Sequence, residues 1–243
     1  MSVPMIETRG LTRSFGAKRV LAGVDLAVAP GESLCVIGQS GTGKSVLLKC
    51  ILGLVPPDAG QVLWQDQPLD AARLPQFLSR FGMLFQGGAL FDSLNVWQNI
   101  AFRLRQRMPD REARAIALDK LARVGLAPET ADLMPAELSG GMAKRVGLAR
   151  AIADDPAVIF FDEPTTGLDP IRARAIDDLI RSIVTETGAT AITITHDMRS
   201  VSLIGDRVAM LQNGVIAHIG PVAGMDSEPA LAAFLGRAPV AHP

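Results

Sequence analysis

Three features of the sequence predict an α/β fold built on a parallel β-sheet. The apolar stretch Leu34–Ile37 runs into a glycine-rich loop and then into a segment with helical spacing. Strand-like stretches at 157–161 and 190–195 flank a helical pattern around 171–184, and this alternation is typical of parallel sheets. The chain of 243 residues can bury a substantial core, so we predict one large domain.

Composition and charge narrow the class of protein. Hydrophobic residues make up 48% of the chain, but glycine, proline and charged residues interrupt them before any run approaches the roughly 18 residues of a membrane span. Met1–Phe15 contains charges and no apolar signal core, so we expect a soluble, cytoplasmic protein in which Cys35 and Cys50 are free thiols. The net charge of −1 gives no general attraction to nucleic acid, and no nucleic-acid partner is expected.

The first part of the chain favours an antiparallel β region. Ile6–Thr8 and Leu26–Val28 have strand-like composition, and Pro30-Gly31 is a turn signal. After the next strand and the glycine-rich loop, we predict a helix that ends at Pro56-Pro57. Its apolar residues recur at helical spacing: Leu47, Leu48, Ile51, Leu52 and Val55.

The middle of the chain favours helices. Asp110–Val124 carries alanine and leucine on one face, and Gly125 follows as a C-terminal cap. Near the C-terminus, 207–211 and 215–219 are predicted to form a hairpin through Asn213-Gly214. The predicted single domain therefore has a core of about 1–87 and 150–221, an inserted helical subdomain of about 88–149, and a tail of 222–243.

The glycine-rich loop carries a phosphate-binding pattern. It fits G-x-x-x-x-G-K-[ST] through Gly38, Gln39, Ser40, Gly41, Thr42, Gly43, Lys44 and Ser45, and it lies between a strand and a helix as that motif requires. The glycines let backbone N–H groups point at phosphate oxygens, and the helix N-terminus adds partial positive charge. We expect Lys44 to reach the β and γ phosphates and Ser45 to bind Mg²⁺. This loop predicts a P-loop NTPase with a RecA-like sheet, which leaves GTPases, kinases and many ATPases open.

Two carboxylates follow the apolar strand near residue 160. Asp162 ends this strand, at the sheet edge where ligands bind in such folds, and is expected to hold Mg²⁺ through water. Glu163 comes next, and its carboxylate could accept a proton from the water that attacks the γ-phosphate. A metal ligand and a general base are thus predicted side by side.

Leu138-Ser139-Gly140-Gly141-Met142 resembles the signature of ABC transporter ATPases, normally written LSGGQ, with Met142 in place of the glutamine. The family's other motifs are matched in order by Phe15 at the adenine ring, Gln86 in the Q-loop, Gly167-Leu168-Asp169 in the D-loop and the switch histidine His196. The chain resembles an ABC ATP-binding subunit over nearly all its length. The resemblance implies an ATPase that uses ATP and Mg²⁺, with Gln86 also near the metal and Asp169 near the nucleotide.

The resemblance further implies a homodimer in which ATP lies between the phosphate loop of one chain and the signature of the other. Ser139, Gly140 and Gly141 offer a hydroxyl and backbone N–H groups at a predicted helix N-terminus, which is an anion site. No phosphate-binding motif of the same chain is adjacent in sequence, so a second molecule would supply the phosphate. His196 is then expected to donate to the γ-phosphate. Phe15 keeps the aromatic ring of the family's usual tyrosine but lacks its hydroxyl.

Two stretches, Met83–Val96 and Leu133–Glu137, resemble the ATPases of Mla-type (maintenance of lipid asymmetry) phospholipid transporters. This narrower resemblance implies transport of phospholipid between the inner and outer membranes from the cytoplasmic face of the inner membrane. The implied partners are an integral-membrane permease, an MCE-domain lipid-binding subunit and a small STAS-domain protein. Three alternatives stay open: a transporter of another solute, a non-transport ABC protein, and a module that binds ATP without turnover.

The region after Gln86 has two possible readings. Its apolar residues with few neighbouring charges are Leu90, Phe91, Val96 and Trp97. They predict either a docking surface for a cytoplasmic helix of the permease or the core of the helical subdomain. The tail residues Leu231, Phe234 and Leu235 predict either a short helix that contacts a partner or a loose terminus.

Overall fold

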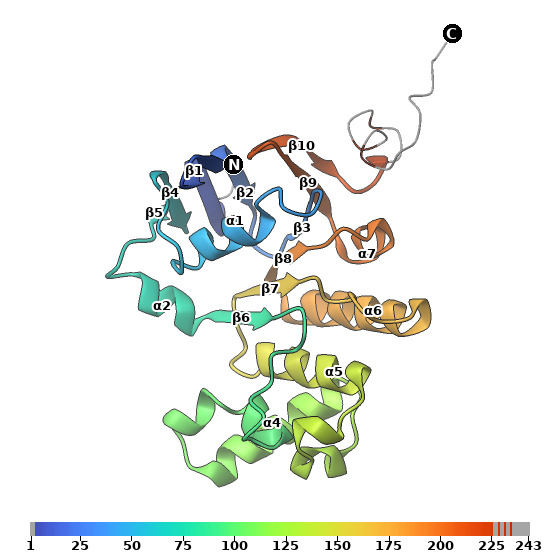
Figure 1. The fold of residues 1–243 in the computed structure, drawn as a ribbon. Helices are drawn as coiled ribbons and strands as arrows, with labels where there is room; N and C mark the ends of the chain where they lie inside the picture. Colours follow the sequence, from blue (N-terminus) through green and yellow to red (C-terminus); the bar gives the residue numbers. More distant parts are fainter. Residues whose placement is uncertain (1–2, 226–227, 229–230, 232–233, 235–243) are drawn as a thin grey trace. The chain divides into compact units, whose positions relative to one another are not determined.

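The computed structural model describes residues 3–225 together with Glu228, Leu231 and Phe234. The chain divides into two units: the first contains 1–78 and 192–243, and the second contains 79–191 (Figure 1). The helical segment 88–149 lies in the second unit, and its borders as a subdomain stay a prediction. The expected tail helix falls largely outside the described residues; within it, Leu231 is buried.

In the first unit, the amino-terminal β region is antiparallel, as predicted, and its strands are longer than the sequence indicated. The sheet has the order β2-β1-β4-β5 (Figure 1). β1 contains register shifts, among them one between Thr8 and Leu11, which accommodate polar residues within the strand. These polar residues interrupt the apolar pattern, so the full length of the strand was not predicted. The strands are β1 (Ile6–Phe15), β2 (Lys18–Val28), β4 (Ala59–Trp64) and β5 (Gln67–Pro68).

The first unit also contains the parallel strands that carry the phosphate loop. β3 (Ser33–Ile37) pairs in parallel with β9 (Arg207–Gln212), and β9 pairs with β10 (Val215–Pro221) through Asn213-Gly214, so the predicted hairpin is confirmed. β8 (Thr190–Ile194) crosses the division between the units, and the N–H of Thr195 directly after it donates to the Val36 carbonyl at 3.2 Å. All five residues of β3 are buried, as expected for a strand covered on both faces.

The helix after the phosphate loop is shorter than predicted. α1 covers Lys44–Ile51, with Leu52 as its C-cap, and does not continue to Val55. Gly53 adopts a left-handed φ of 67°, so the chain leaves the helix before it reaches Pro56-Pro57, where the helix was predicted to end. Two further helices of this unit, α2 (Leu74–Ser79) and α7 (Met198–Ile204), were not indicated by the sequence.

In the second unit, β6 (Phe81–Leu84) and β7 (Val158–Asp162) pair in parallel, and Thr190 N–H donates to the Ala157 carbonyl at 3.0 Å. α6 (Pro170–Thr187) extends the predicted helix by one residue at its start and three at its end. The alternation of strand and helix in this stretch is therefore confirmed, and with it the α/β class.

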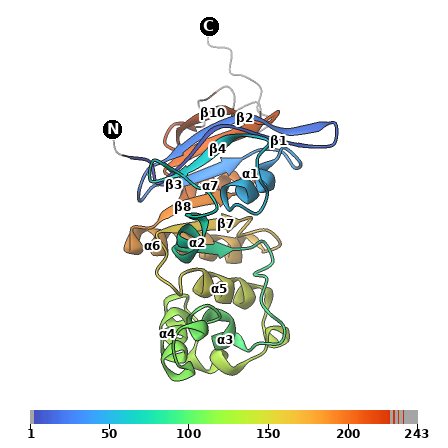
Figure 2. The ribbon, with the colours of Figure 1, turned by 90° about the vertical axis from the view of Figure 1, so that its left-hand side faces the viewer.

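The rest of the second unit is helical, as predicted, and includes α4 (Asp110–Arg123) (Figure 2). Ala113, Ala117 and Leu121 of α4 are fully buried in its core. Its other elements are α3 (Val96–Ile100), α5 (Gly140–Ala151) and the 3₁₀ turns Leu104–Gln106, Pro128–Asp132 and Pro135–Glu137. Cys35 and Cys50, both in the first unit, are buried and form no disulfide, as expected. No helix among the described residues has the length and apolar character needed to span a bilayer.

Candidate functional site

The phosphate loop in the first unit has a backbone that only glycine allows at two points. A Cβ atom at Gly38 would lie 2.5 Å from the Leu211 carbonyl oxygen, and one at Gly43 would lie 2.9 Å from Cγ1 of Val20. Gly43 also has a φ of 106°. The strands beside the loop thus force its path, and the path needs residues without side chains.

Lys44 places a cation against this loop. Its side chain is 8% exposed, and its Nζ donates to the carbonyls of Gly38 at 2.7 Å and Gln39 at 2.9 Å. α1 starts here, has no acidic residue in its first turn, and has Gly43 as N-cap, which carries no side chain to accept from the first N–H groups. Gln39, Ser40 and Ser45 are exposed. A buried ammonium, a bare helix start and an exposed hydroxyl form a donor set that fits a triphosphate with a bound cation.

Phe15 lies at the end of β1 and is 48% exposed. The guanidinium carbon of Arg13 lies 4.9 Å from the centre of its ring, and Arg13 itself pairs with Asp58 at 2.8 Å. Asp58 also accepts from the Ser14 N–H at 2.6 Å. The ring therefore carries a fixed cation on one side, an arrangement that orients it for stacking.

His196 is the last predicted residue of the first unit. It is exposed and lies between β8 and α7. The hydroxyl oxygen of Thr195 accepts from the Asp197 N–H at 3.0 Å, and Asp197 caps α7 by accepting from the Arg199 N–H at 2.8 Å. The turn that carries His196 is thus fixed on both sides.

Asp162 and Glu163 lie in the second unit, at the end of β7. Glu163 has a φ of 49°, in the left-handed region that a side chain seldom adopts. Its carboxylate accepts a hydrogen bond of 2.9 Å from the Thr166 hydroxyl. Such strain persists only where the surroundings hold it, and it occurs most often at functional positions.

The signature begins α5 in the second unit. Ser139 is the N-cap, and its hydroxyl oxygen accepts from the Met142 N–H at 3.3 Å. A Cβ atom at Gly140 would meet nothing within 4 Å, and one at Gly141 would meet only the Arg172 side chain, at 3.9 Å. Packing within the described residues therefore does not demand glycine at either position. The pair leaves a bare helix start at the surface.

Asp169 caps the next helix. Its carboxylate accepts from the N–H groups of Arg172 at 3.0 Å and Ile171 at 3.1 Å. The hydrogen bond from the Arg172 backbone is the largest cause that lowers the pKa of this carboxyl. Asp169 thus has a structural role as the N-cap of α6, whatever it contacts on another molecule.

Gln86 follows β6, is exposed, and is held through its backbone. Lys144 of α5 donates from Nζ to the Gln86 carbonyl at 3.0 Å and to the Pro164 carbonyl at 2.7 Å. Burial lowers the pKa of Lys144, and the negative charge of Glu163 opposes that shift. The second unit thus brings together the Q-loop and the turn after Glu163. Lys144 was not predicted as a site residue. The sequence indicates it only as a lysine between Met142 and Val146, in a helix that is largely buried.

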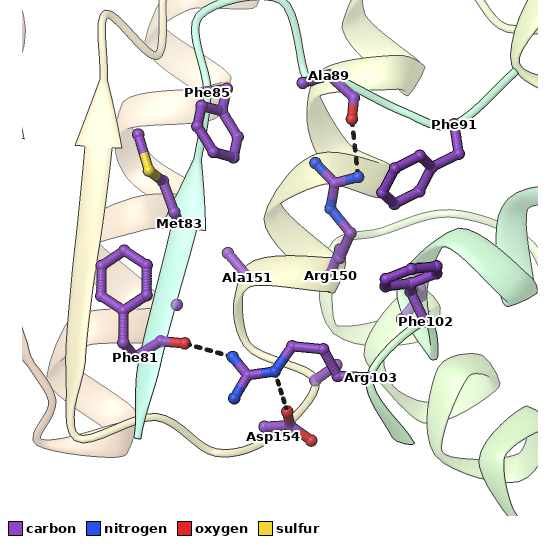
Figure 3. Close-up of a pocket in the computed structure, with 13 residues that line it drawn as sticks. Phe81, Met83, Phe85, Ala89, Phe91, Phe102, Arg103, Arg150, Ala151 and Asp154 are labelled. Atoms are coloured by element: carbon purple, nitrogen blue, oxygen red, sulfur yellow. Dashed lines mark hydrogen bonds and ion pairs between the residues drawn. The ribbon is translucent and has the colours of Figure 1, made fainter. Parts of the chain in front are cut away.

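An apolar hollow of about 430 Å³ opens beside the Q-loop in the second unit (Figure 3). Exposed rings of Phe85, Phe91 and Phe102 line it, and Arg103 pairs with Asp154 at its edge. Arg150 also lines the hollow, with its guanidinium carbon 5.8 Å from the centre of the Phe91 ring. The close-up shows the three phenylalanine rings around this opening.

The structure separates the two readings of the region after Gln86. Val96 is 0% and Trp97 8% exposed, so both belong to the core and the docking expectation is wrong for them. Leu90 is half-buried and does not line the hollow. Phe91 does line it, because the Asn99 side chain, fully buried, holds the Phe91 backbone through bonds of 2.7 and 3.1 Å.

A family model described as "ABC transporter" matches residues 21–166. The chain is 40% identical over 237 residues to "Probable ribonucleotide transport ATP-binding protein mkl" of Mycobacterium tuberculosis, covering 95% of this chain and 66% of that one. It is 41% identical over 225 residues to "Methionine import ATP-binding protein MetN" of Brucella abortus, covering 91% and 61%. The chain thus spans less than two thirds of the length of these relatives.

Solved structures with the same fold include a dimer of MJ0796, described as a bacterial ABC transporter cassette. It has a TM-score of 0.81 at 30% identity and covers 90% of this chain and 99% of that one. A dimeric post-hydrolysis state of MJ0796 bound to ADP and Pi has a TM-score of 0.80 at the same identity and coverage. For cbiO1 of Clostridium perfringens, part of the complex cbiONQ, the TM-score is 0.85 at 27% identity, with coverage of 97% and 95%.

Proposed function

This chain belongs to the ABC transporter ATPase family, and on that premise we propose that it hydrolyses ATP to power a transporter that moves phospholipid between the inner and outer membranes. Cassettes of this family use ATP with Mg²⁺, form dimers and work with membrane permeases. The observation that carries the ATPase proposal is the phosphate loop, where Gly38 and Gly43 cannot bear side chains and Lys44 is buried against the loop carbonyls. The lipid proposal rests on the two sequence stretches that resemble Mla-type ATPases.

In the first unit, the loop N–H groups and Lys44 bind the β and γ phosphates, and Phe15 stacks on adenine. Mg²⁺ supplies neutralisation of charge on the phosphate oxygens when it is bound. Its proposed ligands are Ser45, Asp162 and Gln86. These residue roles are proposals drawn from the family motifs.

Glu163 is the proposed general base. Its carboxylate takes a proton from the attacking water, and the Thr166 hydroxyl bonded to it limits the orientations that it can adopt. His196 donates a hydrogen bond toward the γ-phosphate from its fixed turn. The left-handed backbone at Glu163 supports a positional requirement, because strain of this kind occurs most often at functional positions.

ATP joins two copies of the chain. A Cβ atom at Gly140 or Gly141 would meet almost nothing among the described residues, so the missing side chains leave room for a second molecule. Ser139 offers its hydroxyl at the same helix start, where the helix dipole favours a phosphate. The proposed dimer places the start of α5 against the nucleotide that the other copy binds. Asp169 is proposed to lie near the nucleotide as well.

We propose that the hollow beside the Q-loop receives a cytoplasmic segment of the permease. Three exposed rings in one concave surface, with the Arg103–Asp154 pair at the edge, are a combination that suits a peptide segment with an apolar face. In this proposal, an MCE-domain lipid-binding subunit and a small STAS-domain protein complete the complex. The ATPase is then peripheral at the cytoplasmic face of the inner membrane.

A second candidate is transport of a small polar solute, which the names of the relatives favour: methionine import for MetN and ribonucleotide transport for mkl. To separate the two, the tagged chain is purified in mild detergent, and its co-purifying subunits and bound small molecules are identified by mass spectrometry. Phospholipid together with a permease and an MCE-domain subunit supports lipid transport. Methionine or nucleotide together with a periplasmic solute-binding protein contradicts it. ATPase activity of the same preparation is measured separately, so the enzymatic proposal stands or falls by itself.

A further inference from the structure

We propose that Lys144 is a positioning residue of the hydrolytic site, whose ammonium ties the backbone beside Glu163 to the backbone of Gln86. This inference rests on the proposed role of Glu163 as general base. It adds a residue that the family motifs do not assign, and a physical connection between the Q-loop and the base.

Lys144 is 6% exposed, and its ammonium has two carbonyl acceptors, Pro164 at 2.7 Å and Gln86 at 3.0 Å. An ammonium buried away from water needs such acceptors, so the three groups hold one another in place. The acceptors belong to different loops, one after β7 and one after β6. The pairing of β6 with β7 ends at Leu84 and Phe161, and the Lys144 side chain extends this connection to the loops beyond.

Pro164 directly follows Glu163, so the bond to its carbonyl acts on the turn that carries the base. That turn is strained, because Glu163 has a φ of 49°. Strain of this kind persists only under external constraint. The Thr166 hydroxyl bonds the Glu163 carboxylate at 2.9 Å, and the Thr166 N–H bonds the Glu163 carbonyl at 3.3 Å. Lys144 adds a constraint by bonding the carbonyl of the next residue.

α5 also holds the backbone shortly after Gln86, at Gly88 and Ala89. Arg150 donates to the carbonyls of Gly88 at 2.7 Å and Ala89 at 2.8 Å. Gly147 approaches so closely that a Cβ atom there would lie 3.2 Å from the Gly88 Cα. The Q-loop segment and α5 are therefore packed as one element, and Lys144 connects this element to the turn of Glu163.

This geometry predicts an effect on turnover and not on nucleotide affinity. Lys44, the main phosphate-binding residue, donates to the carbonyls of Gly38 and Gln39, whereas Lys144 donates to those of Gln86 and Pro164. Misplacing a catalytic group by about 1 Å can cost on the order of 10²-fold in rate. Loss of the Lys144 bonds should therefore lower kcat and leave KM for ATP nearly unchanged.

The test uses the assembled transporter and compares Lys144→Met with Lys144→Gln. Methionine has similar length and no donor, whereas the glutamine amide has two N–H groups and can donate to both carbonyls. We expect kcat to fall ~10- to 100-fold in Lys144→Met. In Lys144→Gln we expect a fall of under about tenfold. In both variants KM for ATP should stay within about threefold of wild type.

Lys120→Met is the matched control. Lys120 is equally buried, at 5% exposed, lies in the same unit, and pairs with Asp155 at 2.7 Å, away from the residues assigned to hydrolysis. Its loss should lower the melting temperature and leave kcat within about twofold of wild type. A larger loss of kcat in Lys144→Met than in Lys120→Met, at comparable thermal stability, supports the positioning role.

Wild-type kcat in Lys144→Met overturns the inference, and so does a loss of kcat that Lys120→Met shares. A rise in KM without a change in kcat also overturns it. If Lys144→Met does not fold, Lys144→Ser, too short to reach either carbonyl, replaces it under the same criteria. A wild-type complex that does not hydrolyse ATP would instead refute the proposed function. Glu163→Gln with undiminished hydrolysis would refute the base and, with it, the positioning role of Lys144.

Discussion

Lys44 Nζ lies 2.7 Å from the carbonyl oxygen of Gly38, the first residue of its own loop. The bond spans the loop from end to end, so the position of the ammonium depends on the same glycine path that Leu211 and Val20 impose from outside. Binding of phosphate is therefore a property of the packed strands as well as of the loop sequence.

The first prediction concerns this ammonium. Lys44→Ala should weaken ATP binding, because a charge-assisted hydrogen bond to phosphate contributes about 1.5–3 kcal/mol, or roughly 10- to 150-fold in Kd. Isothermal titration calorimetry with ATP and Mg²⁺ measures the change. Lys49→Ala, an exposed lysine of the same helix, is the control and should bind like wild type. Equal affinity in the two variants would remove Lys44 from the site.

A second prediction concerns the glycines of the signature. Gly140→Val should leave the melting temperature of the isolated chain nearly unchanged, because a Cβ atom at this position meets nothing within 4 Å. It should abolish the ATP-dependent dimer, because the added side chain occupies the space proposed for the second copy. Thermal melting and analytical ultracentrifugation measure the two effects. Gly82→Ala is the opposite control: its Cβ would lie 2.0 Å from the Ala151 carbonyl oxygen, so it should lower stability. ATP-dependent dimers of Gly140→Val would contradict the proposed interface.

A third prediction concerns the adenine ring. Arg13→Ala removes the cation held beside Phe15, and a cation–π contact of this kind contributes about 0.5–1 kcal/mol. KM for ATP should therefore rise roughly two- to fivefold with kcat unchanged. Arg19→Ala, an exposed arginine on β2, serves as the control. If only Phe15→Leu raised KM and Arg13→Ala did not, the ring would act without its cation.

A fourth prediction concerns the wall of the hollow. Asn99→Ala should leave backbone groups of the 91–95 loop without partners and cost about 1–3 kcal/mol of unfolding free energy. Phe91 then loses its fixed position, so stimulation of the ATPase by the permease should fall more than basal hydrolysis does. Chemical denaturation and ATPase assays with and without permease measure these effects. Asp92→Ala, at an exposed neighbouring position, should change neither quantity.

The sequence predicted the elements whose signals are local. Strands β3, β7 and β8 were predicted because they are short apolar runs, and helices α4 and α6 because of their helical patterns, whereas β6 was not predicted. β1 was recognised only at Ile6–Thr8, because Arg9 and Gly10 break the pattern and the register shift that accommodates them depends on its partner strands. α1 ends before its predicted end because the chain turns at Gly53. The prediction placed the end of the helix at the two prolines that follow.

The site shows the same limit. The phosphate loop, Asp162 and Glu163 form contiguous patterns that carry their chemistry in the sequence itself. Lys144 bonds carbonyls that lie 58 and 20 residues away along the chain. No local sequence pattern indicates contacts over such separations, so this role could not be predicted. Val96 and Trp97 could be placed in the core only by packing, since apolar residues give the same signal for a core and for a docking surface.

The central claim is that ATP holds two copies of this chain together until Glu163 activates water. Glu163→Gln tests it most directly, with dimerisation followed by analytical ultracentrifugation in ATP and Mg²⁺ alongside phosphate release. We predict a stable dimer with retained ATP and hydrolysis slowed by ~10²–10⁴-fold relative to wild type. A monomer in saturating ATP, or phosphate release at the wild-type rate, would contradict the account.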